Sequence, residues 1–186
     1  MAAVLINSKG EISKVLVISY SLTGNNEALA SHIAADLGAQ HFRVSESKHR
    51  TTATIIFDVL FNRTPKVSPG VDKMEGYGLV IFTGPVWLGL VASPLRLYLR
   101  HLIGNPTPYA FVSVSGGSDG PNPKLMGDLK KRVGKDPVSL IDLHIADLLP
   151  ADPKPSRKDT SAYHLTESDI KSLTNQAVRK LTECNL

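Results

Sequence analysis

A run of hydroxyl, amide and glycine residues follows the first long apolar segment of the chain. Residues 15–18 read Val-Leu-Val-Ile, and residues 19–26 read Ser-Tyr-Ser-Leu-Thr-Gly-Asn-Asn. Hydroxyls and amides are neutral hydrogen-bonding groups, and a turn that opens a helix adds backbone N–H groups without intrahelical acceptors. We therefore expect a cradle for a phosphate group. Its residues are Ser21, Leu22, Thr23, Gly24, Asn25 and Asn26.

This stretch differs from the phosphate loops of two large nucleotide-binding classes. No Lys-Ser or Lys-Thr pair follows Gly24, as the G-x-x-x-x-G-K-[ST] loop requires, and there is no G-x-G-x-x-G pattern. The competing interpretation is an ordinary strand-to-helix turn in which Thr23 is the N-cap, because short polar side chains favour that position.

Apolar periodicity predicts the elements that must position this stretch. Residues 15–18 are expected to form a strand buried on both faces, and residues 24–37 a helix that ends at Gly38. Further strands are expected at residues 40–45, 77–83, 109–114 and 137–143, and further helices at 51–62, 93–104, from Pro123 and after Thr166. Five strands alternating with five helices predict an α/β fold with a doubly wound, five-stranded parallel sheet.

Two more loops that contain glycine follow predicted strands, at residues 84–89 and 115–118. If the strand order is 2-1-3-4-5, the order reverses between the first and third strands, and ligands bind at the carboxyl ends there. All three loops would then meet at one crevice. Their further candidate ligand contacts are Pro85, Val86, Trp87, Leu88, Gly89, Ser115, Gly116 and Gly117.

The predicted helix over residues 51–62 is apolar around nearly its whole circumference. One stripe is enough to pack on the sheet, so Phe57 and Phe61 need another cover. Either a neighbouring loop covers them, or they form the contact of a homodimer. The stripe expected to face the sheet consists of Ile55, Ile56, Val59 and Leu60.

Two later helices carry further expectations about burial. Ser93 is expected as an N-cap, with Arg96 and Arg100 on the outer face of its helix. Met126 is expected on the inner face of the helix that Pro123 begins. Residues 1–13 are expected to be a lead-in, in which residues 2–6 could add an edge strand.

Composition limits the function classes. The 186 residues fit one domain, residues 1–186, and a net charge of +4 without a basic, aromatic stripe argues against a nucleic-acid binder. No apolar run approaches the ~18 residues of a membrane helix, and residues 1–6 lack the charged leader of a secretory signal. The single cysteine, Cys184, can close no internal disulfide, which fits a cytoplasmic location.

The remaining side chains suggest neither metal nor hydrolase chemistry. The six histidines have no metal-ligand spacing such as H-E-x-x-H, and no G-x-S-x-G pattern is present. We therefore expect no metal site and no nucleophilic serine of that kind.

Three motifs together resemble one known family. Residues 20–26 resemble the [ST]-x-T-G-x-T phosphate loop of flavodoxin-like proteins, with Asn26 in place of the last threonine. Residues 84–89, Gly-Pro-Val-Trp-Leu-Gly, resemble the G-x-P-V-aromatic-x-G loop of flavodoxins and flavodoxin-like quinone reductases, and residues 115–117 match the place of a second flavin loop. The resemblance implies a flavodoxin-like fold and FMN as the cofactor, with its phosphate in the first loop and its ring at the other two.

The residues of the two later loops suit a flat ring, although each has a simpler explanation. Trp87, the only tryptophan, could stack on the ring, or it could be a hydrophobic lid on the sheet edge. Gly89, Gly116 and Gly117 could let backbone N–H groups approach the ring edge, or they could serve turn geometry alone. Flavin redox chemistry requires no acid or base from the protein, so no catalytic residue is expected.

Three functions are compatible with this resemblance. The first is an FMN-dependent oxidoreductase that takes reducing equivalents from NAD(P)H and passes them to a quinone-like or other small acceptor. The second is a flavodoxin-type carrier of single electrons between proteins, a class that is typically acidic, whereas this chain has a pI near 9.2. The third is a flavodoxin-fold binding module without cofactor. It stays open because Asn26 replaces the last threonine of the family's phosphate loop.

Overall fold

The computed structural model describes residues 14–47 and 50–183. Its centre is a parallel sheet in the order β2-β1-β3-β6-β7, and this confirms the predicted 2-1-3-4-5 order. The strands are β1 (Val15–Ser19), β2 (Gln40–Arg43), β3 (Leu79–Thr83), β6 (Tyr109–Ser115) and β7 (Ser139–His144). The suggested edge strand at residues 2–6 and Cys184 lie outside the described residues.

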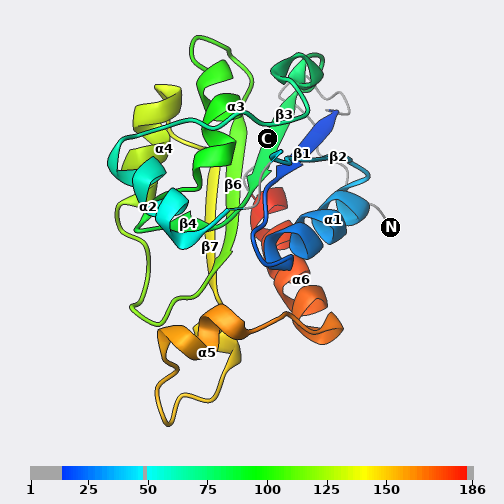
Figure 1. Cartoon of the computed structure of the whole chain (residues 1–186). Coiled ribbons are helices and arrows are strands. Elements are labelled where there is room, and N and C mark those ends of the chain that lie inside the picture. The colour runs from blue at the N-terminus through cyan, green and yellow to red at the C-terminus, as the bar shows by residue number, and fades with distance from the viewer. Residues whose placement is uncertain (1–13, 48–49, 184–186) are drawn as a thin grey trace.

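Helices cover both faces of the sheet (Figure 1). They are α1 (Asn25–Leu37), α2 (Thr52–Leu60), α3 (Arg96–His101), α4 (Leu125–Val133), α5 (Arg157–Ala162) and α6 (Glu167–Glu183). Single 3₁₀ turns lie at Val71–Met74, Ser93–Leu95 and Ile145–Leu148. The helices α1 and α6 pack on one face, whereas α2, α3 and α4 pack on the other.

Successive side chains of a strand point to opposite faces of the sheet, so one strand contributes to both cores. In β1, Val15 and Val17 contact the α1 and α6 side, whereas Leu16 and Ile18 contact the α3 and α4 side. Each fully buried aliphatic side chain stabilises the fold by roughly 1.5–3 kcal/mol. An aliphatic run without alternation is therefore the correct signature of a strand covered on both faces.

The outer faces of three helices differ from the prediction. Arg96 is 1 % exposed and Asp128 is buried, whereas Met126 is exposed. In α2, Ile55 and Val59 pack on the core, but Asp58 is the buried residue, and Ile56 and Leu60 are exposed. The predictions for Arg96, Met126, Ile56 and Leu60 were therefore wrong.

A polar cluster between α2 and α3 explains the differences in these two helices. The Asp58 carboxylate accepts hydrogen bonds from Arg50 Nη1 (2.8 Å) and Ser93 Oγ (3.1 Å). Arg96 Nη1 donates to the carbonyl oxygens of Asp58 (2.9 Å) and Arg63 (3.0 Å). Buried charged groups are stable when they are paired in this way, and hydrophobic periodicity cannot reveal the pairing. Ser93 thus binds Asp58 and is not the N-cap that we expected.

Candidate functional site

Loops from three adjacent strands meet at the carboxyl edge of the sheet. Beyond β1, Tyr20 N donates to Thr83 O (2.9 Å), and beyond β3, Gly84 N donates to Val112 O (3.2 Å). These bonds continue the ladder past the strands, so the segments that follow β1, β3 and β6 leave the sheet side by side. The reversal of strand order between β1 and β3 therefore lies where the sequence predicted it.

The N-terminus of α1 lacks a side-chain cap. Gly24 holds the N-cap position with φ 95°, and its N–H donates to Ser21 Oγ (3.0 Å). Thr23 is exposed and is not the N-cap, which removes the competing interpretation of this turn as a threonine-capped one. Within the described chain, the first bond of the helix runs from Ala28 N to Gly24 O, so the three preceding N–H groups have no acceptor.

These three free N–H groups belong to Asn25, Asn26 and Glu27. They carry the positive end of a helix of 13 residues, and anions are stabilised there by the helix dipole and by direct hydrogen bonds. The hydroxyls of Ser21 and Thr23 precede them. This donor set fits a phosphate group, because it offers several N–H and O–H groups without a competing cap.

The side chains of Asn25 and Asn26 are already occupied. Asn26 Nδ2 donates to Val114 O (2.9 Å), and Asn26 Oδ1 accepts from Val114 N (3.0 Å). Asn25 Nδ2 donates to Tyr163 O (2.8 Å), and its Oδ1 accepts from Leu165 N (3.1 Å). Both amides are buried and satisfied on both ends, so they anchor α1 to β6 and to the segment before α6. The two residues thus offer a ligand only their backbone N–H groups.

The predicted loop over residues 84–89 is largely a β-hairpin. Its strands are β4 (Val86–Trp87) and β5 (Leu90–Val91), joined by Leu88 (φ 52°) and Gly89 (φ 80°). A two-residue turn with positive φ at both positions matches the twist of a hairpin, and it needs glycine at one of them. Leu88, at the tip, is 66 % exposed.

Trp87 is packed within the protein. It is 9 % exposed, and its ring system forms a T-shaped pair with Tyr20, with 5.9 Å between the ring centroids. The Arg50 guanidinium lies 5.3 Å from the Trp87 ring centroid, within cation–π range. Arg50 itself is held by Glu46 (2.6 and 2.7 Å). Arg50 therefore already covers one face of the Trp87 ring.

A network of polar side chains around Asp142 supports the loop after β6. Asp142 accepts from Ser113 Oγ (2.7 Å) and from Asn122 Nδ2 (2.9 Å), and its Oδ2 lies 3.1 Å from His144 Nε2. A Cβ added at Gly117 would lie 2.3 Å from His144 Cβ. The glycine is thus required by packing on His144 as well as by its φ of 72°.

The other two residues of this loop also have partners. A Cβ added at Gly116 would lie 2.9 Å from Thr160 Oγ1 on α5, and Ser115 Oγ accepts from Asn122 Nδ2 (3.3 Å). Figure 1 shows α5 beyond the carboxyl end of β7, next to this part of the site. The segment that follows Leu149 leads into α5, whose N-cap is Ser156.

Two side chains in this region, Tyr20 and His41, have pKa values shifted from their ordinary ranges. Burial, followed by the negative charge of Glu46, raises the pKa of Tyr20, whose hydroxyl donates to Glu46 Oε2 (3.1 Å). Burial lowers the pKa of His41, which lies beside β1 and shares a 2.8 Å hydrogen bond with Ser19 Oγ. Tyr20 therefore stays protonated at neutral pH, and His41 stays neutral.

Sequence reasoning missed the supporting residues of the site. The loops are held by Glu46, Arg50, Asn122, Asp142 and His144, which belong to no motif and come from three separate segments of the sequence. The only available signal is position, since Asp142 and His144 are near the end of a predicted strand. Nowhere in residues 14–47 and 50–183 do three or more possible metal ligands gather.

Comparison with known proteins places the chain by its fold. No family model and no curated protein matches the sequence. Among solved structures, the flavoprotein from Lactobacillus acidophilus in complex with FMN is 20 % identical, with a TM-score of 0.60 over 70 % of this chain and 93 % of that chain. A putative flavoprotein from Bacteroides uniformis is 15 % identical, with a TM-score of 0.62 over 80 % of this chain and 95 % of that one.

A third similar structure covers more of the chain. The flavodoxin, WrbA-like protein from Agrobacterium tumefaciens is 12 % identical, with a TM-score of 0.50 over 92 % of this chain and 97 % of that one. At these identities the likeness concerns the fold alone. Together with the strand order, it shows that the fold is flavodoxin-like and confirms the fold that the motifs implied.

Proposed function

We propose that this flavodoxin-like chain binds FMN and passes reducing equivalents from NAD(P)H to a quinone-like or other small acceptor. The observation that carries the proposal is the uncapped N-terminus of α1, whose three free N–H groups lie beside the reversal of strand order. A phosphate ester bound there extends its ligand along the carboxyl edge, toward the loops that follow β3 and β6. The similar Lactobacillus acidophilus protein was solved in complex with FMN, which agrees with this cofactor.

In this proposal the chain binds the phosphate with neutral donors. The N–H groups of Asn25, Asn26 and Glu27, with the hydroxyls of Ser21 and Thr23, surround the phosphate, and Leu22 and Gly24 shape the turn. Charge-assisted hydrogen bonds of this kind are about twice as strong as neutral ones. No cationic side chain is required in the cradle.

In this proposal the flavin ring lies between the hairpin and the loop after β6. Leu88 offers exposed apolar surface at the hairpin tip, next to Pro85, Val86 and Gly89, and the other loop offers the half-buried backbone of Ser115, Gly116 and Gly117. Because Arg50 covers the Trp87 ring, we assign Trp87 to the support of the hairpin and Leu88 to the ring. FMN, when bound, supplies the redox chemistry, and the chain positions its ring and limits water access.

The alternative within the same fold is a carrier of single electrons between proteins. The net charge of +4 is the observation that separates the two, since an electron carrier of this fold is typically acidic. Mixing the protein with FMN, NADPH and menadione tests them. We expect steady NADPH oxidation that depends on added FMN, and no NADPH oxidation above the level of free FMN would favour the carrier.

A cofactor-free binding module is the third possibility, and copurification tests it. We expect yellow protein with flavin absorbance after mild purification, or full uptake when FMN is added. A colourless protein that takes up no FMN would favour the binding module.

We further propose a homodimer through α2 and a cytoplasmic location. Phe57 and Phe61 are 54 % and 66 % exposed and stack on each other at 5.8 Å between centroids, next to exposed Ile56 and Leu60. A patch of this kind is unusual on a monomer surface. Sedimentation should give twice the chain mass, and Phe57→Ser with Phe61→Ser should give the single chain mass. In the described segments, no helix has the length and apolarity to cross a membrane.

A further inference from the structure

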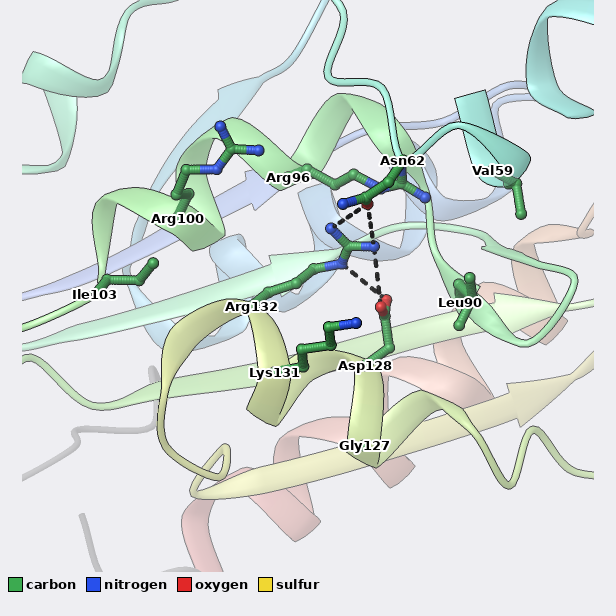
Figure 2. Close-up of a pocket in the computed structure, with 10 residues that line it drawn as sticks. All are labelled: Val59, Asn62, Leu90, Arg96, Arg100, Ile103, Gly127, Asp128, Lys131 and Arg132. Carbon is green, nitrogen blue, oxygen red and sulfur yellow. Dashed lines mark hydrogen bonds and ion pairs between the residues drawn. The ribbon is translucent and has the colours of Figure 1, made fainter. Parts of the chain in front are cut away.

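A basic cavity of about 530 Å³ lies behind the hairpin, between α3 and α4 (Figure 2). Its lining includes four cationic side chains and one carboxylate, together with Asn62, which follows the C-cap of α2. The cations are Arg96, Arg100, Lys131 and Arg132, and the carboxylate is Asp128. The cavity thus concentrates a charge of about +3 in a volume typical of small-molecule sites.

The only carboxylate in this lining is already used. Asp128 Oδ1 lies 2.9 Å from Arg132 Nη2, and Asp128 Oδ2 accepts from Arg132 Nε and from Val91 N, both at 3.0 Å. Its oxygens are therefore occupied by Arg132 and the Val91 backbone, and its charge also acts on Arg96 at longer range. Within the described chain, Lys131 has no partner, and Arg100 donates only to the Thr64 hydroxyl (3.1 Å).

Arg96 is the strongest sign that an anion belongs here. Its side chain is almost fully buried, and Nη1 donates to two carbonyl oxygens, but Nε and Nη2 have no acceptor in the described chain. Buried guanidinium groups are normally satisfied, because an unpaired buried charge is costly. Burial and the neighbouring Arg132 lower the pKa of Arg96 to about 10, so it is still a cation at neutral pH.

Asn62 marks where the anion would bind. Its Oδ1 accepts from both Nη1 and Nη2 of Arg132 at 3.2 Å, and Arg96 lines the same cavity (Figure 2). The Arg132 guanidinium thus has a neutral amide oxygen as its acceptor besides Asp128, at a long hydrogen-bond distance. Asn62 is exposed, so its side chain can turn away and leave this position to an anion oxygen.

We propose that this cavity binds the phosphate group of a small anionic molecule. The phosphate oxygens replace Asn62 Oδ1 as acceptors for Arg132, bring an acceptor to Arg96, and pair with Arg100 and Lys131 at the rim. Guanidinium groups favour phosphate because their forked donors match its oxygens. A concave cavity suits a small molecule better than an extended polyanion. This site is separate from the α1 cradle, and it does not depend on the proposed redox activity.

The test is calorimetric titration of the full chain with inorganic pyrophosphate at constant ionic strength. FMN is present at saturation and occupies the α1 cradle, so pyrophosphate cannot bind there. We expect one binding site, weakened at least tenfold by Arg100→Gln with Lys131→Gln. Both of these residues are exposed, so folding should not suffer. The matched control, Lys171→Gln with Arg179→Gln on α6, removes the same charge and should change the Kd by less than twofold.

A second variant adds an internal anion. Asn62→Asp supplies a carboxylate in the position of Oδ1, and we expect it to raise the Tm and to weaken pyrophosphate binding at least tenfold. The proposal is overturned if the parent protein gives no heat with millimolar pyrophosphate, or if both cavity variants bind as the parent does. Binding of heparin without pyrophosphate binding would also overturn it, because it would indicate a surface for polyanions instead.

Discussion

Thr23 is the side chain that the account assigns most directly to phosphate binding. Its hydroxyl is exposed and makes no bond within the described chain, so Thr23→Val removes a donor without disturbing a fold contact. A hydrogen bond to a charged group contributes roughly 1.5–3 kcal/mol. We expect about a tenfold or greater increase in the Kd for FMN, measured by quenching of flavin fluorescence. Thr52→Val on α2 is the matched control, and an equal effect there would contradict the assignment.

Asn26 has a structural role that the motif did not suggest. The sequence predicted an amide donor for the ligand, but the amide pairs with both polar atoms of the Val114 backbone. We expect Asn26→Ala to lower the free energy of unfolding by about 2–3 kcal/mol, because it leaves buried backbone groups unpaired. Urea denaturation measures this change. No loss of stability would show that the Asn26–Val114 pair contributes nothing.

His41 gives the fold a dependence on pH. Burial lowers its pKa in the folded state, while the positive charge of Arg43 acts in the same direction and Glu27 opposes it. The unfolded chain therefore binds a proton more readily below about pH 6.5, so stability is full above that pH and falls as the pH decreases toward the folded-state pKa. Unfolding at pH 7.5 and 5.5 should show the loss, and His41→Asn should reduce it. An identical loss in His41→Asn would assign it to other groups.

At the scale of elements, the strands were predictable and the helix faces were less so. The strands β1, β3 and β6 are mostly apolar runs with flanking turn residues, and these local signals are enough to identify them. The edge strands β2 and β7 mix polar and apolar residues, so their local signal is weaker. The buried faces of α2, α3 and α4 depend instead on Asp58, Arg96 and Asp128, which are paired across elements. Helical periodicity alone predicts that such charged residues lie on the solvent-exposed face of the helix. The hairpin was missed because its strands are only two residues each.

Asp58 is the residue on which the packing of α2 depends. It binds Arg50, whose side chain is 5 % exposed, and Ser93 in the 3₁₀ turn that precedes α3. We expect Asp58→Ala to destabilise the protein by about 3–5 kcal/mol, since it leaves a buried cation with fewer partners. The control is Asp72→Ala, whose exposed pair with Lys73 should be worth less than about 1 kcal/mol. Thermal unfolding compares them, and similar small effects would show that the cluster is not needed.

At the scale of the molecule, topology turns separate local motifs into one site. The loops after β1, β3 and β6 come from distant parts of the sequence, and the parallel order of the sheet brings them to one edge. That convergence could be predicted from the alternation of strands and helices. The residues that support the loops could not, because Asp142, Asn122 and Arg50 act through tertiary contacts alone. The basic cavity likewise joins α2, α3 and α4 without any motif.

The proposed function depends on the start of α1 as the binding site for the phosphate group of a flavin. Comparing the Kd values of FMN and riboflavin for the protein without bound flavin tests it most directly, because the two ligands differ only in that phosphate. We predict that FMN binds at least about a hundredfold more tightly, which corresponds to two charge-assisted hydrogen bonds. Equal affinities, or no binding of FMN, would contradict the account.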